Sequence, residues 1–111
     1  MAANYYQDGN TMDWINSTGK TVLSGQAVPV GNITGVAHGD IADGGEGVLH
    51  MAGVFILPKV DTETWERGAK LYLTAEGLLT AVVPADNAVV AGTGWITSGA
   101  GETESRVRLG Y

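Results

Sequence analysis

Glycine is the residue type that most constrains how this chain can fold. Seventeen of the 111 residues are glycine, and they are spread along the sequence instead of being pooled in one linker. Glycine adopts backbone conformations that other residues disfavour, so this spacing indicates many tight turns between short strands. The sequence therefore predicts an all-β fold, a small β-barrel or sandwich of short antiparallel strands.

The length and the residue usage favour a single β domain over residues 11–111. Hydrophobic residues make up 44% of the chain, and two separate pieces would each be too small to bury a useful core. The chain contains no cysteine, so neither disulfides nor thiolate metal sites can hold the fold together. Packing of apolar side chains must supply the stability.

Charge and hydropathy exclude two classes of partner. The formal net charge is −6, and no run of lysine or arginine could neutralise a row of phosphates. No apolar run approaches the length of a bilayer span, and the first ten residues lack the pattern of a secretory signal. We expect a soluble protein, made in the cytoplasm, that binds neither nucleic acid nor membrane.

Residues 1–10 form an unusual opening. They include Tyr5 and Tyr6 and show neither a helical nor a strand period. This pattern predicts an extended N-terminal arm that docks on a neighbouring subunit.

The first half of the remaining chain predicts paired strands. We expect residues 11–16 and 20–23 to form a hairpin, which places Trp14 near a sheet edge. A second hairpin is predicted over residues 24–37, with Pro29 on an edge strand because proline cannot donate to the ladder. An exposed loop follows at residues 38–47.

The second half predicts the core, one short helix and two further hairpins. Residues 48–57 are the most apolar segment and are expected at the centre of the core, bent at Gly53. Residues 61–68 begin with acids and end in glycine, which predicts a short helix. Two hairpins are then expected, one pairing residues 69–74 with 78–83 and one pairing 88–97 with 106–109.

A faint internal repeat relates Gly25-x-x-Val28-x-Val30 to Gly68-x-x-Leu71-x-Leu73. One duplication in a small barrel would explain it, and so would the common chemistry of hairpin turns. Both explanations stay open from the sequence.

Residues able to carry out chemistry are few. Ser24 or Ser98 could be paired with one of the two histidines, but no nucleophile elbow surrounds either serine. His38, Asp40, Asp43 and Glu46 lie within one loop, where solvated turn acids are the simpler interpretation and calcium or magnesium at a subunit junction is the alternative. We therefore predict no catalytic residue, no cofactor and no metal site.

Aromatic side chains are the best candidates for binding a partner. Trp95 and Tyr72 lie inside strand-like runs and are expected in the core. Tyr5, Tyr6 and Tyr111 lie near the chain ends, and together with Trp14 they are the predicted partner-binding residues.

The order of motifs resembles the capsid cement, or head decoration, proteins of tailed bacteriophages. The resemblance covers nearly the whole chain and is carried by the opening Asn4-Tyr5-Tyr6-Gln7-Asp8-Gly9, by Ser24-Gly25-Gln26-Ala27-Val28-Pro29-Val30-Gly31, by Ile33-Thr34-Gly35-Val36-Ala37, by Glu46-Gly47, by Gly53-Val54-Phe55-Ile56-Leu57-Pro58-Lys59, by Gly68-Ala69-Lys70-Leu71-Tyr72 and by Val107-Arg108-Leu109. The sequence departs from the pattern at residues 87–94, and at Leu73, where an aromatic residue often stands.

The resemblance implies a non-enzymatic virion protein with a barrel-like fold. Such a protein stabilises the assembled head by binding its outer surface, bridging major capsid protein subunits, often as a homotrimer near three-fold positions. Multivalent attachment would multiply weak contacts over the lattice.

Three other functions remain open from the sequence. The first is a different β-barrel module of the phage particle, in the tail or baseplate or binding carbohydrate, where Trp65 beside Asp61 and Glu63 is the local sugar-site candidate. An enzyme built on residues 38–46 is the second. A lipoyl- or biotinyl-type carrier domain is the third, although no lysine stands at a convincing hairpin tip.

Overall fold

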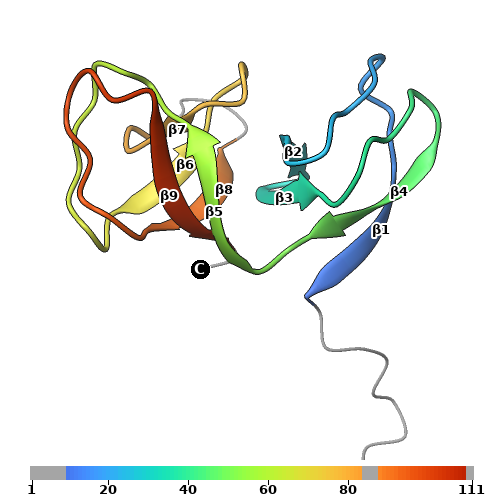
Figure 1. Cartoon of the computed structure of the whole chain (residues 1–111), viewed down its shortest axis with the longest axis horizontal. Helices are drawn as coiled ribbons and strands as arrows, with labels where there is room; N and C mark the ends of the chain where they lie inside the picture. The colour runs from blue at the N-terminus through green and yellow to red at the C-terminus, as the bar shows by residue number, and fades with distance from the viewer. Residues whose placement is uncertain (1–9, 84–87, 110–111) are drawn as a thin grey trace, which may run out of the picture.

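The computed structural model describes residues 10–83 and 88–109. Within these ranges nine strands form one curled sheet and no residue is helical, so the predicted all-β fold is confirmed (Figure 1). No helix among the described residues is long and apolar enough to cross a membrane. The strands are β1 (Thr11–Ile15), β2 (Ala27–Val30), β3 (Ile33–Ala37), β4 (Glu46–His50), β5 (Gly53–Pro58), β6 (Lys70–Leu73), β7 (Leu79–Thr80), β8 (Val89–Gly94) and β9 (Glu104–Leu109).

The strands gather into two curled halves that lie side by side (Figure 1). In the N-terminal half, residues 10–52, antiparallel pairing runs from β1 to β4 to β3 to β2. In the C-terminal half, residues 53–109, it runs from β5 to β9 to β8 to β6 to β7. The sheet is continuous because Ile33 of β3 pairs in parallel with Val90 of β8.

The two halves repeat the same backbone pattern. Val22 and Ile41 exchange two backbone hydrogen bonds of 2.9 and 2.8 Å, and Trp65 and Ser98 exchange two of 3.1 and 2.9 Å. The same correspondence relates β1 to β5, β2 to β6, β3 to β8 and β4 to β9, and the registers match except after Leu71, where an irregularity shifts the β6–β8 pairing by one residue. The repeat noticed in the sequence is therefore a repeat of structure that spans both halves.

A turn glycine opens the second strand pair of each half. Gly25 and Gly68 have φ angles of 85° and 97°, a region that favours glycine. The N–H of Gly25 donates to Ala37, and the N–H of Gly68 donates to Gly94, the residue that corresponds to Ala37. These are the two glycines on which the sequence repeat rests.

A buried polar side chain holds the long loop of each half in place. The Asn16 amide Nδ2 donates to the carbonyls of Lys20 and Ile41 at 2.7 and 2.9 Å. In the C-terminal half, Lys59 Nζ donates to the carbonyl of Glu63 at 2.7 Å and also reaches the carbonyls of two residues in the loop before β9, Gly99 and Glu102. Both side chains are buried, so these bonds satisfy amide and ammonium donors that would otherwise lie unpaired away from water.

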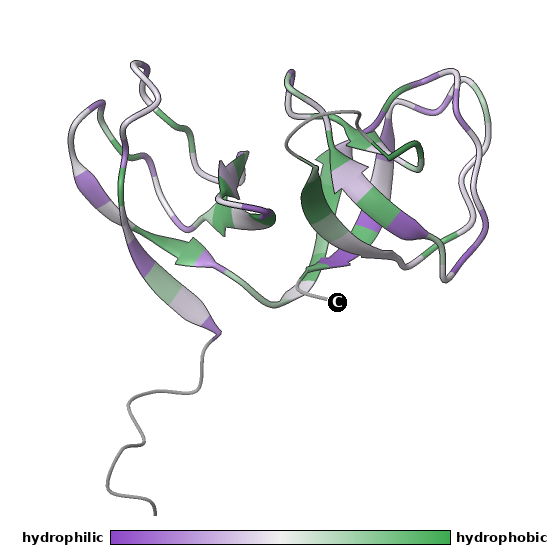
Figure 2. Cartoon of the chain, turned by 180° about the vertical axis from the view of Figure 1, so that it is seen from behind, coloured by the Kyte–Doolittle hydropathy of each residue, from purple (hydrophilic) through white to green (hydrophobic). Residues whose placement is uncertain are grey.

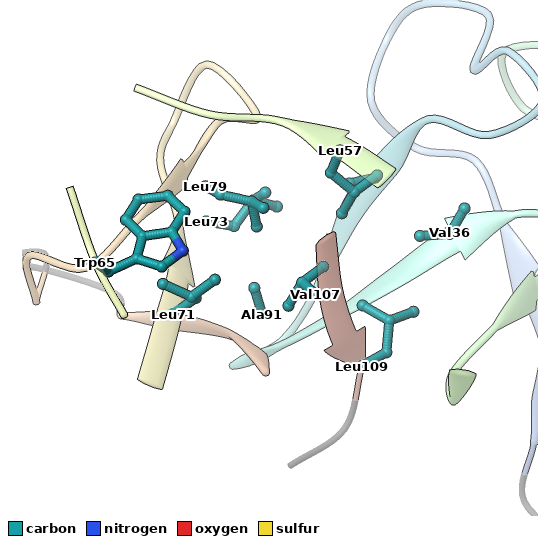
Figure 3. Packing of buried hydrophobic residues seen from close by; sticks show 10 residues of the cluster. Val36, Leu57, Trp65, Leu71, Leu73, Leu79, Ala91, Val107 and Leu109 are labelled. Atoms are coloured by element: carbon teal, nitrogen blue, oxygen red, sulfur yellow. The ribbon is translucent and has the colours of Figure 1, made fainter. Parts of the chain in front are cut away.

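Each half has its own group of buried side chains. The larger group packs inside the C-terminal half, where Leu71, Leu73 and Leu79 lie on the side of the Trp65 ring and Leu57 belongs to the same cluster (Figure 3). The smaller group lies inside the N-terminal half and includes Val22 and Leu49. Ala27 and Val36 of the N-terminal half belong to the larger group, and their packing joins the two halves.

The predicted helix at residues 61–68 is wrong. The segment consists of turns and one isolated bridge, because the Trp65 backbone must be extended to bond to Ser98 in both directions. A helix of one or two turns has no stability of its own against such pairing, since its nucleation is costly. The acids and the glycine that suggested a helix belong to turns.

The predicted pairing of residues 11–16 with residues 20–23 is also wrong. β1 pairs along its whole length with β4, and Val22 of the second segment bridges Ile41 instead. Residues 48–57 form parts of two strands, as the bend at Gly53 suggested, and they contribute Leu49, Met51 and Leu57 to the buried core, although not every apolar residue of the segment is buried. Val54 and Ile56 are exposed, because alternate residues of β5 point away from the core.

The other predicted hairpins are confirmed. β2 pairs with β3 and lies at an edge that carries Pro29, β6 pairs with β7, and β8 pairs with β9. β1 ends the main strand order, so Trp14 lies on an edge strand.

Candidate interaction surface

The outer face of the C-terminal half carries apolar side chains that the core does not use. Val54 and Ile56 alternate with buried partners along β5 and are 45% and 60% exposed. They lie opposite Arg108 and Arg106 of β9 respectively, so each aliphatic side chain lies beside a guanidinium group. Figure 2 shows this alternation of hydrophobic and hydrophilic residues along the strands of the C-terminal half.

Trp95 extends this face beyond β9 and is surrounded by arginine. The indole is 45% exposed. The Arg108 guanidinium lies 5.6 Å from the centre of the ring, within the range of a cation–π contact. The backbone N–H of Trp95 donates to the backbone carbonyl of Arg106 at 3.0 Å, and the Arg67 side-chain Nε donates to the backbone carbonyl of Trp95 at 3.4 Å. All three arginines of the chain therefore contact one exposed tryptophan.

We call this face the Trp95 surface and define it by Val54, Ile56, Arg67, Trp95, Arg106 and Arg108. Tryptophan and arginine are the residue types that most often dominate the free energy of binding at protein interfaces. Half of the basic residues of an acidic chain are gathered on this surface. It is therefore suited to a protein partner that offers both apolar and acidic groups.

The N-terminal half carries different chemistry at the corresponding place. His38 corresponds to Trp95 and His50 to Arg108, and the two rings contact each other with Nδ1 of His38 2.9 Å from Nε2 of His50. Ser24 corresponds to Arg67, and its hydroxyl donates to the His38 carbonyl at 3.2 Å. Asp13 of β1 stands where Ile56 stands in β5. The N-terminal half thus has no surface of the tryptophan–arginine kind.

Of the four predicted partner-binding residues, the structure describes only Trp14. Its side chain is half-buried on β1 and packs against the core of the N-terminal half. Tyr5, Tyr6 and Tyr111 lie outside the described residues. Their roles as partner contacts stay predictions.

Side chains of the loop at residues 38–47 pack and hydrogen-bond within the N-terminal half. Ile41 in its middle is buried, and Asp40 Oδ1 accepts a 2.8 Å bond from the Ser24 N–H. Across the described ranges, no three side chains of the metal-binding types lie close enough to hold an ion. The serines considered for catalysis do not contact a histidine ring: Ser24 bonds to a backbone carbonyl, and Ser98 contacts the Ser105 hydroxyl.

Trp65 cannot be the platform of a sugar site. The ring is buried in the core, and Lys59 Nζ lies 4.9 Å from its centre. Glu63, the acid suggested beside it, is bonded to Thr80 and Ala81. The sequence candidate for carbohydrate binding is therefore removed.

Sequence reasoning missed Trp95 as a surface residue. It expected Trp95 in the core because the side chain lies close to an apolar strand. The signal that could have located the surface is the alternation at residues 104–109, where Arg106 and Arg108 must share one face while Val107 and Leu109 share the other.

The fold is that of a small all-β module, and the Trp95 surface is its exposed group of apolar and basic side chains. Comparison with known families agrees with this class: the family model described as phage cement protein matches residues 6–109. The chain therefore belongs to the phage cement protein family, which gives it a capsid cement role and an association with the phage capsid. The searches of curated proteins and of solved structures gave no match.

Proposed function

We propose that this protein is a non-enzymatic cement protein that binds the outer surface of the assembled head and bridges major capsid protein subunits. The observation that carries the proposal is the Trp95 surface, an exposed apolar patch with three arginines. The family to which the chain belongs associates it with the phage capsid. The bound form is a homotrimer, and attachment at many lattice positions multiplies modest contacts. No reacting group takes part.

The Trp95 surface can supply both kinds of contact that a cement protein needs. Val54 and Ile56 offer aliphatic area that gains free energy when removed from water. Arg106 and Arg108 offer donors for carboxylates of the capsid surface, and they steer an otherwise acidic protein into one orientation.

Mixing purified protein with expanded heads that lack it tests the proposal directly. Occupancy is measured by sedimentation with the heads and by imaging, which also gives the number of copies at each position. Trp95→Ala is expected to raise the concentration needed for half occupancy by about tenfold or more, the usual effect of removing an interface tryptophan. His38→Ala, the matched change in the N-terminal half, is expected to bind like the unmodified protein.

The result that would overturn the proposal is an unmodified protein that never binds expanded heads. If Trp95→Ala and His38→Ala bind heads equally well, the cement role stands but the Trp95 surface is not the contact with the capsid.

The N-terminal arm is the second proposed contact, with Tyr5 and Tyr6 reaching the major capsid protein. The Asn10 carbonyl accepts a 2.8 Å bond from the Met51 N–H, so a deletion that spares Asn10 leaves the sheet unaltered. Deleting residues 1–9 should abolish head binding while the unfolding midpoint is unchanged. Full occupancy by the shortened protein would exclude the arm.

A further inference from the structure

The repeat of the two halves is incomplete at one strand. In the C-terminal half, β7 lies between β6 and the segment after β5: Leu79 pairs with Leu73, and its carbonyl accepts a 3.0 Å bond from the Val60 N–H. The N-terminal half is described throughout residues 10–52, and there β2 turns at once into β3 through Gly31-Asn32. No strand of that half lies between β2 and the segment after β1.

A groove of about 690 Å³ lies next to the corresponding place, and its lining includes Lys20 and Pro29, the counterparts of Glu63 and Tyr72, which contact β7. Thr18 and Lys20, from the segment after β1, line one wall, and the turn at residues 74–77 of the C-terminal half lines the other. Ala27 and Val28 of β2 contribute apolar surface. The C-terminal half shows what covers the corresponding surface, namely a short extended strand.

The contacts that hold β7 show what an occupant of the groove needs. The Glu63 carboxylate accepts a 2.6 Å bond from the Thr80 hydroxyl and a 2.8 Å bond from the Ala81 N–H. Lys20 corresponds to Glu63, because its carbonyl accepts the bond from Asn16 just as the Glu63 carbonyl accepts the bond from Lys59. The groove therefore offers a cation where the filled site offers a carboxylate.

We propose that the groove binds a short extended segment of the capsid surface, with a carboxylate of that segment on Lys20. This inference rests on the proposed function, which supplies the capsid as the partner. The family match associates this chain with the phage capsid, which makes the capsid surface the partner within reach of the groove, and a second copy of this chain is the alternative that the cross-linking below distinguishes. β-Strand addition to an exposed sheet edge is an established way for one chain to bind another.

Two features of the groove limit the length and the polar groups of the segment that can bind there. Pro29 has no N–H and stands where Tyr72 pairs with Thr80, so only a few backbone bonds can form along β2. Glu76 on the opposite wall favours a donor on the other side of the segment. An occupant of two or three extended residues, the length of β7, satisfies both conditions.

Carbodiimide cross-linking on decorated heads identifies the occupant. The reagent adds to a carboxylate and activates it. An amine within reach then attacks the activated acyl group, an amide bond forms, and the reagent leaves as a urea. Peptide mass spectrometry is expected to find Lys20 joined to an acidic residue of the major capsid protein. A link only to another copy of this chain, a link only to Glu76 of the same chain, or no link at Lys20 would overturn the proposal.

Charge substitutions give an independent measurement. Lys20→Glu should raise the half-occupancy concentration on heads by about tenfold, the effect of removing a charge-assisted bond, and Lys20→Met should raise it less. Lys70→Met is the matched control, since Lys70 is an exposed lysine of β6 that lies outside the groove and the Trp95 surface. Unchanged binding of Lys20→Glu contradicts the inference, whereas failure of the unmodified protein to bind heads contradicts the proposed function.

Discussion

The two halves of this protein share one backbone plan and differ in what they do with it. The C-terminal half is closed by β7, contains the larger group of buried side chains and carries the Trp95 surface. The N-terminal half lacks a strand at that position, leaves Trp14 half-buried and carries two histidines where its neighbour has tryptophan and arginine. The comparison teaches that one backbone plan can carry different surfaces, because the side chains at corresponding positions differ; under our proposals, the C-terminal half binds through the Trp95 surface and the N-terminal half receives a strand from the partner.

The largest expected effect concerns the two corresponding glycines of β3 and β8. A Cβ on Gly92, which has a φ of 148°, would collide with the Arg108 carbonyl oxygen in the β8–β9 ladder. A Cβ on Gly35 would instead meet only side-chain atoms, the Met51 sulfur at 2.9 Å and Leu49 Cδ1 and Cβ at 3.0 and 3.1 Å, and side chains can shift more easily than a paired backbone carbonyl. We expect Gly92→Ala to destabilise the protein by about 4 kcal/mol and Gly35→Ala by about 1–2 kcal/mol.

Urea unfolding followed by tryptophan fluorescence measures both variants. Equal destabilisation would show that the two ladders tolerate strain alike and would weaken the distinction between the halves.

The second expected effect concerns the buried polar side chains that hold the loops. Lys59→Met removes bonds to three carbonyls and should cost about 3 kcal/mol of unfolding free energy, whereas Asn16→Ala should cost about 2 kcal/mol. The measurement is the denaturation midpoint at constant slope. A Lys59→Met protein as stable as the parent would mean that the cost of burying the ammonium group equals what its bonds return.

The third effect tests the role of β7. Glu63→Gln weakens the carboxylate bonds to Thr80 and Ala81 and should destabilise the protein by about 1 kcal/mol. Lys20→Gln at the corresponding position should change stability by less than about 0.5 kcal/mol, because no strand is held there within the N-terminal half. Thermal unfolding of the free proteins decides between these outcomes, and a larger loss for Lys20→Gln would contradict the assignment of the groove.

The smallest effect separates binding from folding. Trp95→Ala should lower stability by no more than about 1 kcal/mol, since only an exposed cation–π contact with Arg108 is lost. His38→Ala should lie within about 0.5 kcal/mol of the parent. If Trp95→Ala unfolds the protein at room temperature, its loss of head binding says nothing about the surface.

The sequence predicted the elements that depend on local chemistry. The β2–β3 hairpin with Pro29 at its edge and the β6–β7 hairpin followed from alternation and turn residues, because both strands of each pair are neighbours in the chain. The β1–β4 pairing and the Trp65–Ser98 bridge join residues far apart in the chain, and no local pattern reports such partners.

The site was harder to predict than the fold. Val54 and Ile56 belong to the most apolar segment, which suggested the core, yet alternation sends them outward. Trp95 could be placed only after β8 and β9 were known to pair, since the partner strand decides which face is covered. The terminal tyrosines remain a prediction from sequence.

The open sheet edges among the described residues affect how readily free subunits aggregate at high concentration. An unpaired edge is a template for aggregation, and each open edge here carries a residue that opposes it: Asp13 within β1, Pro29 within β2 and Pro58 at the end of β5. We therefore expect free subunits to resist edge-to-edge aggregation. Replacing Pro29 with valine is the change that would most directly remove this resistance.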